Sequence, residues 1–149
     1  MRAGPVASAV AIAVVMAGVG HAVEVPHWKP VAQTDDSVFL LDESSIQMRA
    51  GLLTAWELVE YAWPQYSDGV RYRSQLNLRA YSCDDESWDV LQVTRHAESA
   101  GAGEVVLAGK FSPANVTWNH AVPESVAEHM LREVCALAVT KDLRGTTQG

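Results

Sequence analysis

Residues 70–83 read V-R-Y-R-S-Q-L-N-L-R-A-Y-S-C and contain the clearest structural pattern of the chain. From 70 to 80 its even-numbered positions hold Val, Tyr, Ser, Leu, Leu and Ala, whereas the odd-numbered positions hold Arg, Gln or Asn. Successive side chains of a β-strand point to opposite faces, so this period of two predicts a half-buried antiparallel strand. We expect this strand to form the centre of a sheet.

Further strands are expected on both sides of this central strand. Segments rich in strand-forming residues are 37–41, 52–61, 88–97 and 104–108. For 52–61 a helix is an open alternative, because its apolar residues also fit a period of 3.6. Ser67, Asp68 and Gly69 predict a hairpin turn into the central strand, with 62–66 as the rest of that loop.

Two segments lack a clear period. Residues 23–36 contain two prolines, and we interpret them as an irregular lead-in with Trp28 as a packing anchor. Residues 111–121 contain Pro113 and are predicted to hold a short edge strand at 116–118.

The C-terminal part changes to a helical pattern. Ser125 and Glu128 fit a capping box, and apolar residues then recur at helical spacing across 126–139. The predicted fold class is therefore α+β: an antiparallel, meander-like sheet of about five or six strands with one C-terminal amphipathic helix packed on one face. We expect the even-numbered face of 70–80 to receive this helix.

The chain has two cysteines, Cys83 at the end of the central strand and Cys135 in the predicted helix. Two cysteines in an exported chain of this size predict a structural disulfide that ties the helix to the sheet. A pair of free thiols and a redox pair are the alternatives, although redox pairs are usually close in sequence as C-x-x-C.

The N-terminus is typical of a secretory signal peptide. Arg2 precedes an apolar run at 6–19, and Ala22 ends a small-residue cleavage site. A membrane anchor is the alternative, but about 14 apolar residues are fewer than the ~20 that cross a bilayer. We expect 1–22 to be removed, leaving one domain, 23–149, without a membrane span, in the periplasm, at the cell surface or secreted.

Composition narrows the class of partner. The formal net charge of the 149 residues is −7, which argues against nucleic acid and anionic membranes as partners. No serine lies in a G-x-S-x-G turn, and no cofactor-binding motif is present. His129 and Glu133 have a spacing that can bind metal but lack a third ligand. We therefore predict no catalytic residue, no metal site and no cofactor.

The remaining candidates for a binding site are three arginines. Arg71, Arg73 and Arg79 share the polar side of the central strand and can meet an acidic ligand. The alternative is that they pair with carboxylates of a neighbouring strand, such as Glu57 or Glu60. The tryptophans are predicted to lie mostly in the core, and an exposed one would indicate a contact patch.

An ordered set of residues across the mature chain resembles the surface-adhesin protein E-like domain family of bacterial envelope proteins. The set is Trp28, Asp42, Ser45, Ile46, Gly51, Trp56, Leu58, Tyr61, Arg73, Ser74, Cys83, Gly101, Gly103, Trp118, Pro123, Ser125 and Cys135. The resemblance implies an antiparallel sheet with a C-terminal helix tied to it by the disulfide. It also implies a non-enzymatic binding protein whose partners are extracellular-matrix or serum proteins such as vitronectin, laminin and plasminogen.

Three functions stay open at this point. The first is an exported binding module of this family that binds a host or envelope protein. The second is a small structural periplasmic domain, possible as a homodimer joined at sheet edges. The third is a hydrolase or metal binder, which requires a pocket with converging His, Ser or acidic groups.

Overall fold

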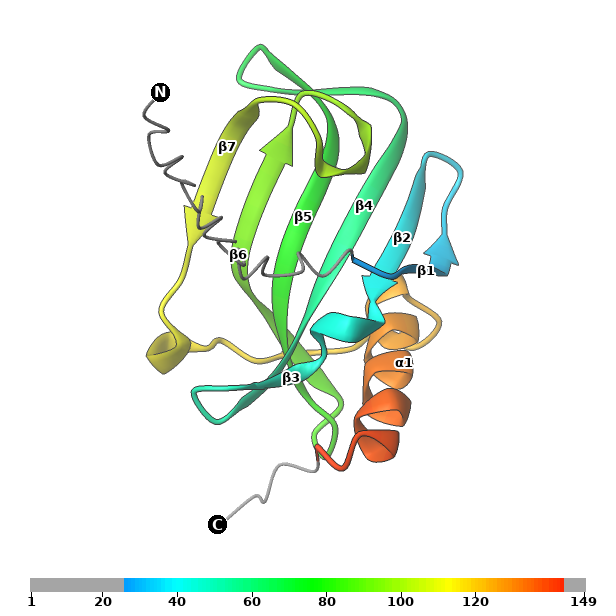
Figure 1. Cartoon of the computed structure of the whole chain (residues 1–149), viewed down its shortest axis with the longest axis vertical. Coiled ribbons are helices and arrows are strands. Elements are labelled where there is room, and N and C mark those ends of the chain that lie inside the picture. Colours follow the sequence, from blue (N-terminus) through cyan, green and yellow to red (C-terminus); the bar gives the residue numbers. More distant parts are fainter. Residues whose placement is uncertain (1–25, 144–149) are drawn as a thin grey trace, which may run out of the picture.

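Residues 26–143 are described by the structure, a computed structural model, and they form one antiparallel sheet with a single α-helix (Figure 1). Six strands pair in the order β1-β2-β4-β5-β6-β7, while β3 and β8 are short additions on β4 and β6. The elements are β1 (Trp28–Gln33), β2 (Ser37–Asp42), β3 (Gln47–Arg49), β4 (Leu52–Ser67), β5 (Val70–Ser82), β6 (Ser87–His96), β7 (Val105–Lys110), β8 (Asn119–His120) and α1 (Val126–Thr140).

The predicted α+β class, the central strand and the C-terminal helix are confirmed. The six strands of the main path match the expected number, and the two short strands raise the total to eight. The segment 52–61 is a strand rather than a helix. The predicted signal peptide, 1–22, lies outside the described residues.

The irregular lead-in predicted for 23–36 is wrong, because β1 begins at Trp28 and pairs with β2. Pro30 is tolerated because β1 is an outer strand of the sheet and carries a bulge between Pro30 and Ala32. Val31 packs against the core formed under the helix, whereas Trp28 is only half-buried.

The loop predicted at 62–66 is also wrong, because β4 continues to Ser67 and pairs again with β5. The pairing register shifts between Glu60 and Gln65, so Pro64 falls in a bulge, where its missing N–H breaks no ladder bond. The turn itself is as predicted: Asp68 and Gly69 both have positive φ, as a two-residue hairpin turn requires.

The predicted edge strand at 116–118 is displaced to β8, Asn119–His120. Val116 instead packs on the small core cluster of Leu78, Ala80 and Leu91. A side chain can pack on a core from a loop, without strand geometry. Val116 was assigned to a strand because β-branched residues are enriched in strands.

The face predicted to receive α1 is wrong. The helix packs on the odd-numbered side of β4 and β5, with Met130, Leu131 and Val134 against Leu53 and Tyr81. Cys83 has the same parity as Tyr81, so the disulfide holds the helix on that side. The even-numbered apolar residues of β5 instead form the second, smaller core with Trp56 and Val116 packed against it.

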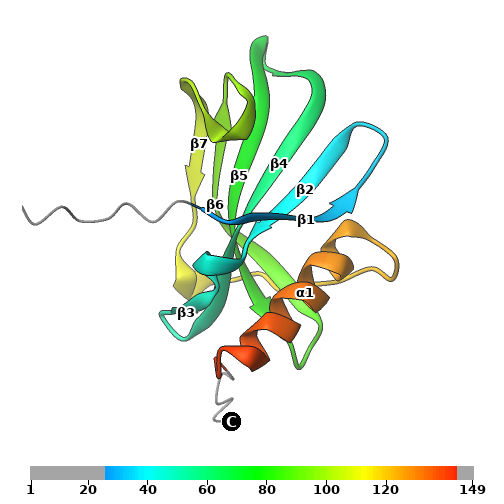
Figure 2. The same ribbon diagram turned by 45° about the vertical axis from the view of Figure 1, so that its right-hand side comes forward.

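The predicted disulfide is present between Cys83 and Cys135, with an S–S distance of 2.09 Å and a Cα–Cα distance of 5.8 Å. The disulfide fastens α1 to the end of β5 that is remote from the β4–β5 turn. Figures 1 and 2 show the helix at that end of the sheet. Across residues 26–143, no helix is long and apolar enough to span a bilayer.

Candidate functional site

The β4–β5 hairpin changes in character along its length. At one end Leu53, Ala55 and Tyr81 are buried under α1. At the other end, beyond the register shift, Tyr66 and Arg71 are exposed and face each other across the two strands. Tyr72 contacts Arg95, which lies on the side of Tyr81, so Arg71 projects from the opposite side of the sheet.

A buried polar layer lies between these two ends. Glu57 is fully buried, and its Oε1 accepts hydrogen bonds from Asn77 Nδ2 at 2.7 Å and from Arg79 Nη2 at 2.9 Å. The Arg79 guanidinium also stacks on Trp88, 4.4 Å from the ring centroid. A charge without a partner is costly in such a site, so the pair of Glu57 and Arg79 is an internal structural element.

The structure therefore separates the three arginines that the sequence suggested. Arg79 is paired with Glu57, the cross-strand pairing that the alternative expected, and its side chain is 12% exposed. Arg71 is exposed and Arg73 is half-buried, and neither side chain forms an ion pair or hydrogen bond with another described residue. Only Arg71 and Arg73 are thus available for a ligand.

Arg95 of β6 lies at the same end of the sheet, on the opposite side from Arg71, and was not predicted from the sequence. It lies opposite Gln75, two positions along β5 from Arg73. Its Nε donates to Gln75 Oε1 at 3.0 Å, and its guanidinium lies 4.8 Å from the centroid of the Tyr72 ring. These contacts fix the side chain without neutralising it, because both partners are uncharged. Its contact with Gln75 could not be predicted, because the two residues lie on different strands and 20 positions apart in the sequence.

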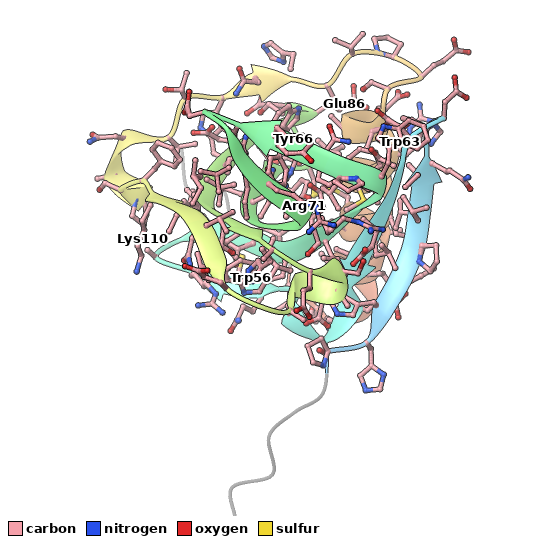
Figure 3. All side chains as sticks on the ribbon, turned by 90° about the horizontal axis from the view of Figure 1, so that it is seen from above. Trp56, Trp63, Tyr66, Arg71, Glu86 and Lys110 are labelled. Atoms are coloured by element: carbon pink, nitrogen blue, oxygen red, sulfur yellow. A yellow bond between two sulfur atoms is a disulfide. The ribbon has the colours of Figure 1, made fainter. Side chains whose placement is uncertain are left out.

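Two exposed aromatic residues lie at the same end. Trp63 is 54% exposed and Tyr66 is 67% exposed, although both belong to β4. Figure 3 looks down on this end of the molecule, where Trp63, Tyr66 and Arg71 are gathered near the β4–β5 turn. An exposed tryptophan was expected to indicate a contact patch. Which tryptophan is exposed was not predicted, because residues 62–66 were assigned to a loop.

We call this surface the arginine end and define it as Trp63, Tyr66, Arg71, Arg73 and Arg95. Aromatic and arginine side chains are the residue types that carry most of the binding energy in protein interfaces. Guanidinium groups recognise carboxylate, sulfate or phosphate oxygens through paired hydrogen bonds. The arginine end therefore carries residue types suited to binding an anionic group of a macromolecule.

A pocket lies at the opposite end of the sheet, beside the disulfide. It is a pocket of about 560 Å³, and its wall includes Met48, Leu52, Trp118, Cys135 and Val139. The walls are predominantly apolar, with Ser82 and Asp84 at the margin. The pocket forms where α1 packs on the sheet.

The described residues show no group of three or more His, Cys, Asp or Glu side chains that can hold a metal ion. Of the pair considered in the sequence, Glu133 accepts a hydrogen bond from Lys29, which also pairs with Glu43 at 3.2 Å. Glu133 thus fastens α1 to β1. The hydrogen bonds to Glu133 and Glu43 raise the pKa of Lys29 above its usual value, so this lysine stays charged.

This chain is similar to a known protein in fold and to a known family in sequence. A search of curated proteins found no match. Among solved structures, crystal form II of Haemophilus influenzae protein E is similar, with a TM-score of 0.51 and 13% sequence identity. The alignment covers 76% of this chain and 97% of that one. The model of the family described as surface-adhesin protein E matches residues 28–136, so the chain belongs to the surface-adhesin protein E family.

Proposed function

We propose that this chain is an exported, non-enzymatic binding module that attaches to a host or envelope protein through the arginine end. The observation that carries the proposal is the exposure of Trp63 and Tyr66 beside arginines without ionic partners, in a member of a surface-adhesin family. Two large aromatic side chains that are exposed at 54% and 67% at one end of a sheet form a candidate contact surface.

Export is part of the same proposal. The predicted signal peptide at 1–22, the disulfide and the surface-adhesin family all fit a protein that works outside the cytoplasm. Disulfides form and persist in oxidising compartments such as the periplasm and the cell surface. Cell fractionation that finds the mature chain in the cytoplasm, with both thiols reduced, would overturn this part.

Binding to immobilised extracellular proteins tests the function directly. The mature chain, 23–149, is titrated over vitronectin, laminin, plasminogen and an extract of envelope proteins, and its affinity for each is measured. The double variant Trp63→Ala/Tyr66→Ala is expected to lose at least about tenfold in affinity. Truncating an aromatic residue at the centre of an interface costs about 2 kcal/mol of binding free energy, which is more than a factor of ten in affinity.

Phe111→Ala is the matched control. Phe111 is 55% exposed and follows β7, away from the β4–β5 turn, so its truncation removes a similar aromatic surface without touching the arginine end. Equal losses in the control and the double variant, or no binding of the wild-type chain to any of these proteins, would overturn the proposal.

A structural homodimer is the second candidate, and the outer strand β7 favours it. β7 pairs with β6 on one side only, contains no proline and exposes Val105. Such an edge can accept a strand from a second copy. Val105→Lys is expected to disrupt the dimer, and a wild-type chain that sediments as a monomer at every concentration would exclude it.

A further inference from the structure

We propose that the pocket beside the disulfide binds a small organic cation with an apolar body, of the alkylammonium class. The pocket lies at the opposite end of the sheet from the arginine end, so the inference is independent of the proposed function. Three observations support it: the cavity has the volume of a small-molecule site, its walls are mostly apolar, and its margin carries an aromatic ring and a carboxylate.

The cavity is built from segments that are far apart in the sequence. Residues of β3, β4, β5 and α1 line it, together with the loop before β8. Its volume of about 560 Å³ is typical of small-molecule sites, which span about 300–1,000 Å³. Cys83 and Cys135 form part of the wall, so the disulfide holds α1 at the cavity by a covalent bond. The site is thus part of the folded chain before any ligand binds.

The walls of the cavity favour an apolar ligand body. Met48, Leu52 and Val139 line it from three different elements, and the buried residues Leu53 and Ala138 line it as well. Met48 is 37% exposed and Val139 is 53% exposed, so both present apolar surface to water in the free chain. A hydrocarbon chain in the cavity would remove that surface from water, which is favourable.

Trp118 supplies a group that recognises positive charge. It lines the cavity and is 42% exposed, and tryptophan is the aromatic residue whose ring face attracts cations most strongly. Figure 1 shows the segment between β7 and α1, which carries Trp118, crossing this end of the sheet. Thr117 N donates to Asp89 Oδ2 at 2.7 Å, and Asn119 Nδ2 donates to Thr117 O at 2.9 Å. These bonds fix the backbone on both sides of the ring.

The charge at the margin has the sign that a cation requires. Asp84 lines the cavity, and Asp85 and Glu86 follow it in the exposed turn between β5 and β6. Among residues 26–143, no lysine or arginine lines the cavity. An ammonium group would therefore be attracted to this margin, whereas the carboxylate of a fatty acid would be repelled.

The basic residues that are closest in sequence to the lining residues do not reverse this charge. Arg49 follows Met48 in β3, so its side chain projects from the other side of that strand. Lys141 follows α1, and its Nζ donates to the backbone oxygen of Glu43. The head group of the ligand is thus the property to vary in a test.

Isothermal titration calorimetry with three octyl compounds tests the inference. Octyltrimethylammonium, octanol and octyl sulfate share one alkyl chain, and each is used below the concentration at which it forms micelles. The mature wild-type chain is expected to bind the ammonium about tenfold more tightly than octanol and to bind the sulfate most weakly. Added salt should weaken the binding of the ammonium, because salt screens its attraction to the carboxylates. Equal affinities for the ammonium and the sulfate, or binding of none of the three, would overturn the inference.

Substitutions at the margin locate the binding site. Asp84→Asn and Trp118→Leu are each expected to weaken binding of the ammonium by about tenfold, because each removes one of the two groups that recognise the charge. Val139→Lys places a positive charge on the wall at a position 53% exposed, and it should weaken binding by at least as much. Asp68→Asn is the matched control, since it makes the same charge change in the exposed β4–β5 turn. It should leave the affinity unchanged.

Urea denaturation of each variant distinguishes a lost site from a lost fold. If Asp84→Asn destabilises the chain, Val139→Lys decides, because it changes an exposed position. The same ammonium affinity in the wild type and in Val139→Lys would overturn the inference. Trp63→Ala/Tyr66→Ala, at the other end of the sheet, should bind the ammonium as the wild type does, so a failure of the proposed function and a failure of this inference give different results.

Discussion

The two ends of β5 differ although they belong to one strand. Near Cys83, the odd-numbered side is covered by α1, and Tyr81 is 3% exposed. Near the β4–β5 turn, the strand is open, and Arg71 is exposed. Between them, Glu57 and Arg79 form a buried ion pair. The covered end thus supplies stability, and the open end is left available for contact.

This difference explains why a single alternating pattern was ambiguous. Both sides of β5 are partly covered, one by α1 at the Cys83 end and the other by the cluster around Leu78 and Leu91. A period of two says that a strand has two unlike faces but does not say how far each is covered. Substitutions at the two ends should therefore separate stability from binding.

The largest expected effect is at the covered end. Cys83→Ser/Cys135→Ser removes a crosslink across a sequence separation of 52, and the free energy of unfolding should fall by about 4 kcal/mol on the chain-entropy model. Urea denaturation of the oxidised wild type and the variant measures this difference. A loss below about 1 kcal/mol would mean that α1 is held by packing alone and that the covered end is not the main source of stability.

The buried polar layer should show the next largest effect. Arg79→Met leaves the Glu57 carboxylate buried without its cation, and the free energy of unfolding should fall by about 3 kcal/mol. Arg71→Met, on the same strand at an exposed position, is the matched control and should change it by less than about 0.5 kcal/mol. The double variant Glu57→Gln/Arg79→Met should recover part of the loss. Equal effects at Arg79 and Arg71 would contradict the division of this face.

Tyr81 gives a pH dependence that belongs to the covered end. Its hydroxyl is buried without a hydrogen-bond partner among residues 26–143, and burial raises its pKa above the usual value of 10.0. The unfolded chain therefore releases this proton first. The associated stability is complete below about pH 10 and is lost as the pH rises above it.

Tyr81→Phe should flatten that alkaline loss of stability and change the free energy of unfolding at neutral pH by about 1 kcal/mol or less, since the hydroxyl has no partner to lose. Denaturant titrations across the alkaline range measure both quantities. Tyr66→Phe, at a position 67% exposed, is the control for loss of a hydroxyl. A variant at Tyr81 with an unchanged alkaline profile would show that this residue is not buried as described.

The smallest effect on stability is expected at the open end. Trp63→Ala/Tyr66→Ala removes side chains that are mostly in water, so the free energy of unfolding should change by no more than about 0.5 kcal/mol per residue. The same variant is expected to lose binding. A drop of several kcal/mol in urea denaturation would instead assign these aromatics to the fold.

Much of the fold was predictable because its signals are local. The alternation at 70–80, the Asp68-Gly69 turn and the capping Ser125, whose Oγ accepts from Glu128 N at 3.2 Å, all act within a few residues. β1 and the end of β4 were missed because their prolines argue against strands unless the edge position or the bulge is known. The side that α1 covers depends on tertiary packing.

The candidate site was less predictable than the fold. The prediction that Arg71, Arg73 and Arg79 share one side is wrong, because the register shift ends the regular alternation before Arg71. Nor does parity reveal that Glu57 removes Arg79 from the surface. Arg95 comes to the same end of the sheet only through the register of β5 with β6. Such long-range pairings are fixed by the folded sheet, and a single sequence carries no direct record of them.

Hydrogen exchange of the mature chain, free and in complex with vitronectin, laminin or plasminogen, distinguishes the two ends of the sheet. Amides at 62–73 are expected to become protected on binding, while those of α1 exchange as in the free chain. Protection that is confined to α1 and the pocket beside Cys135, with 62–73 unchanged, would contradict it.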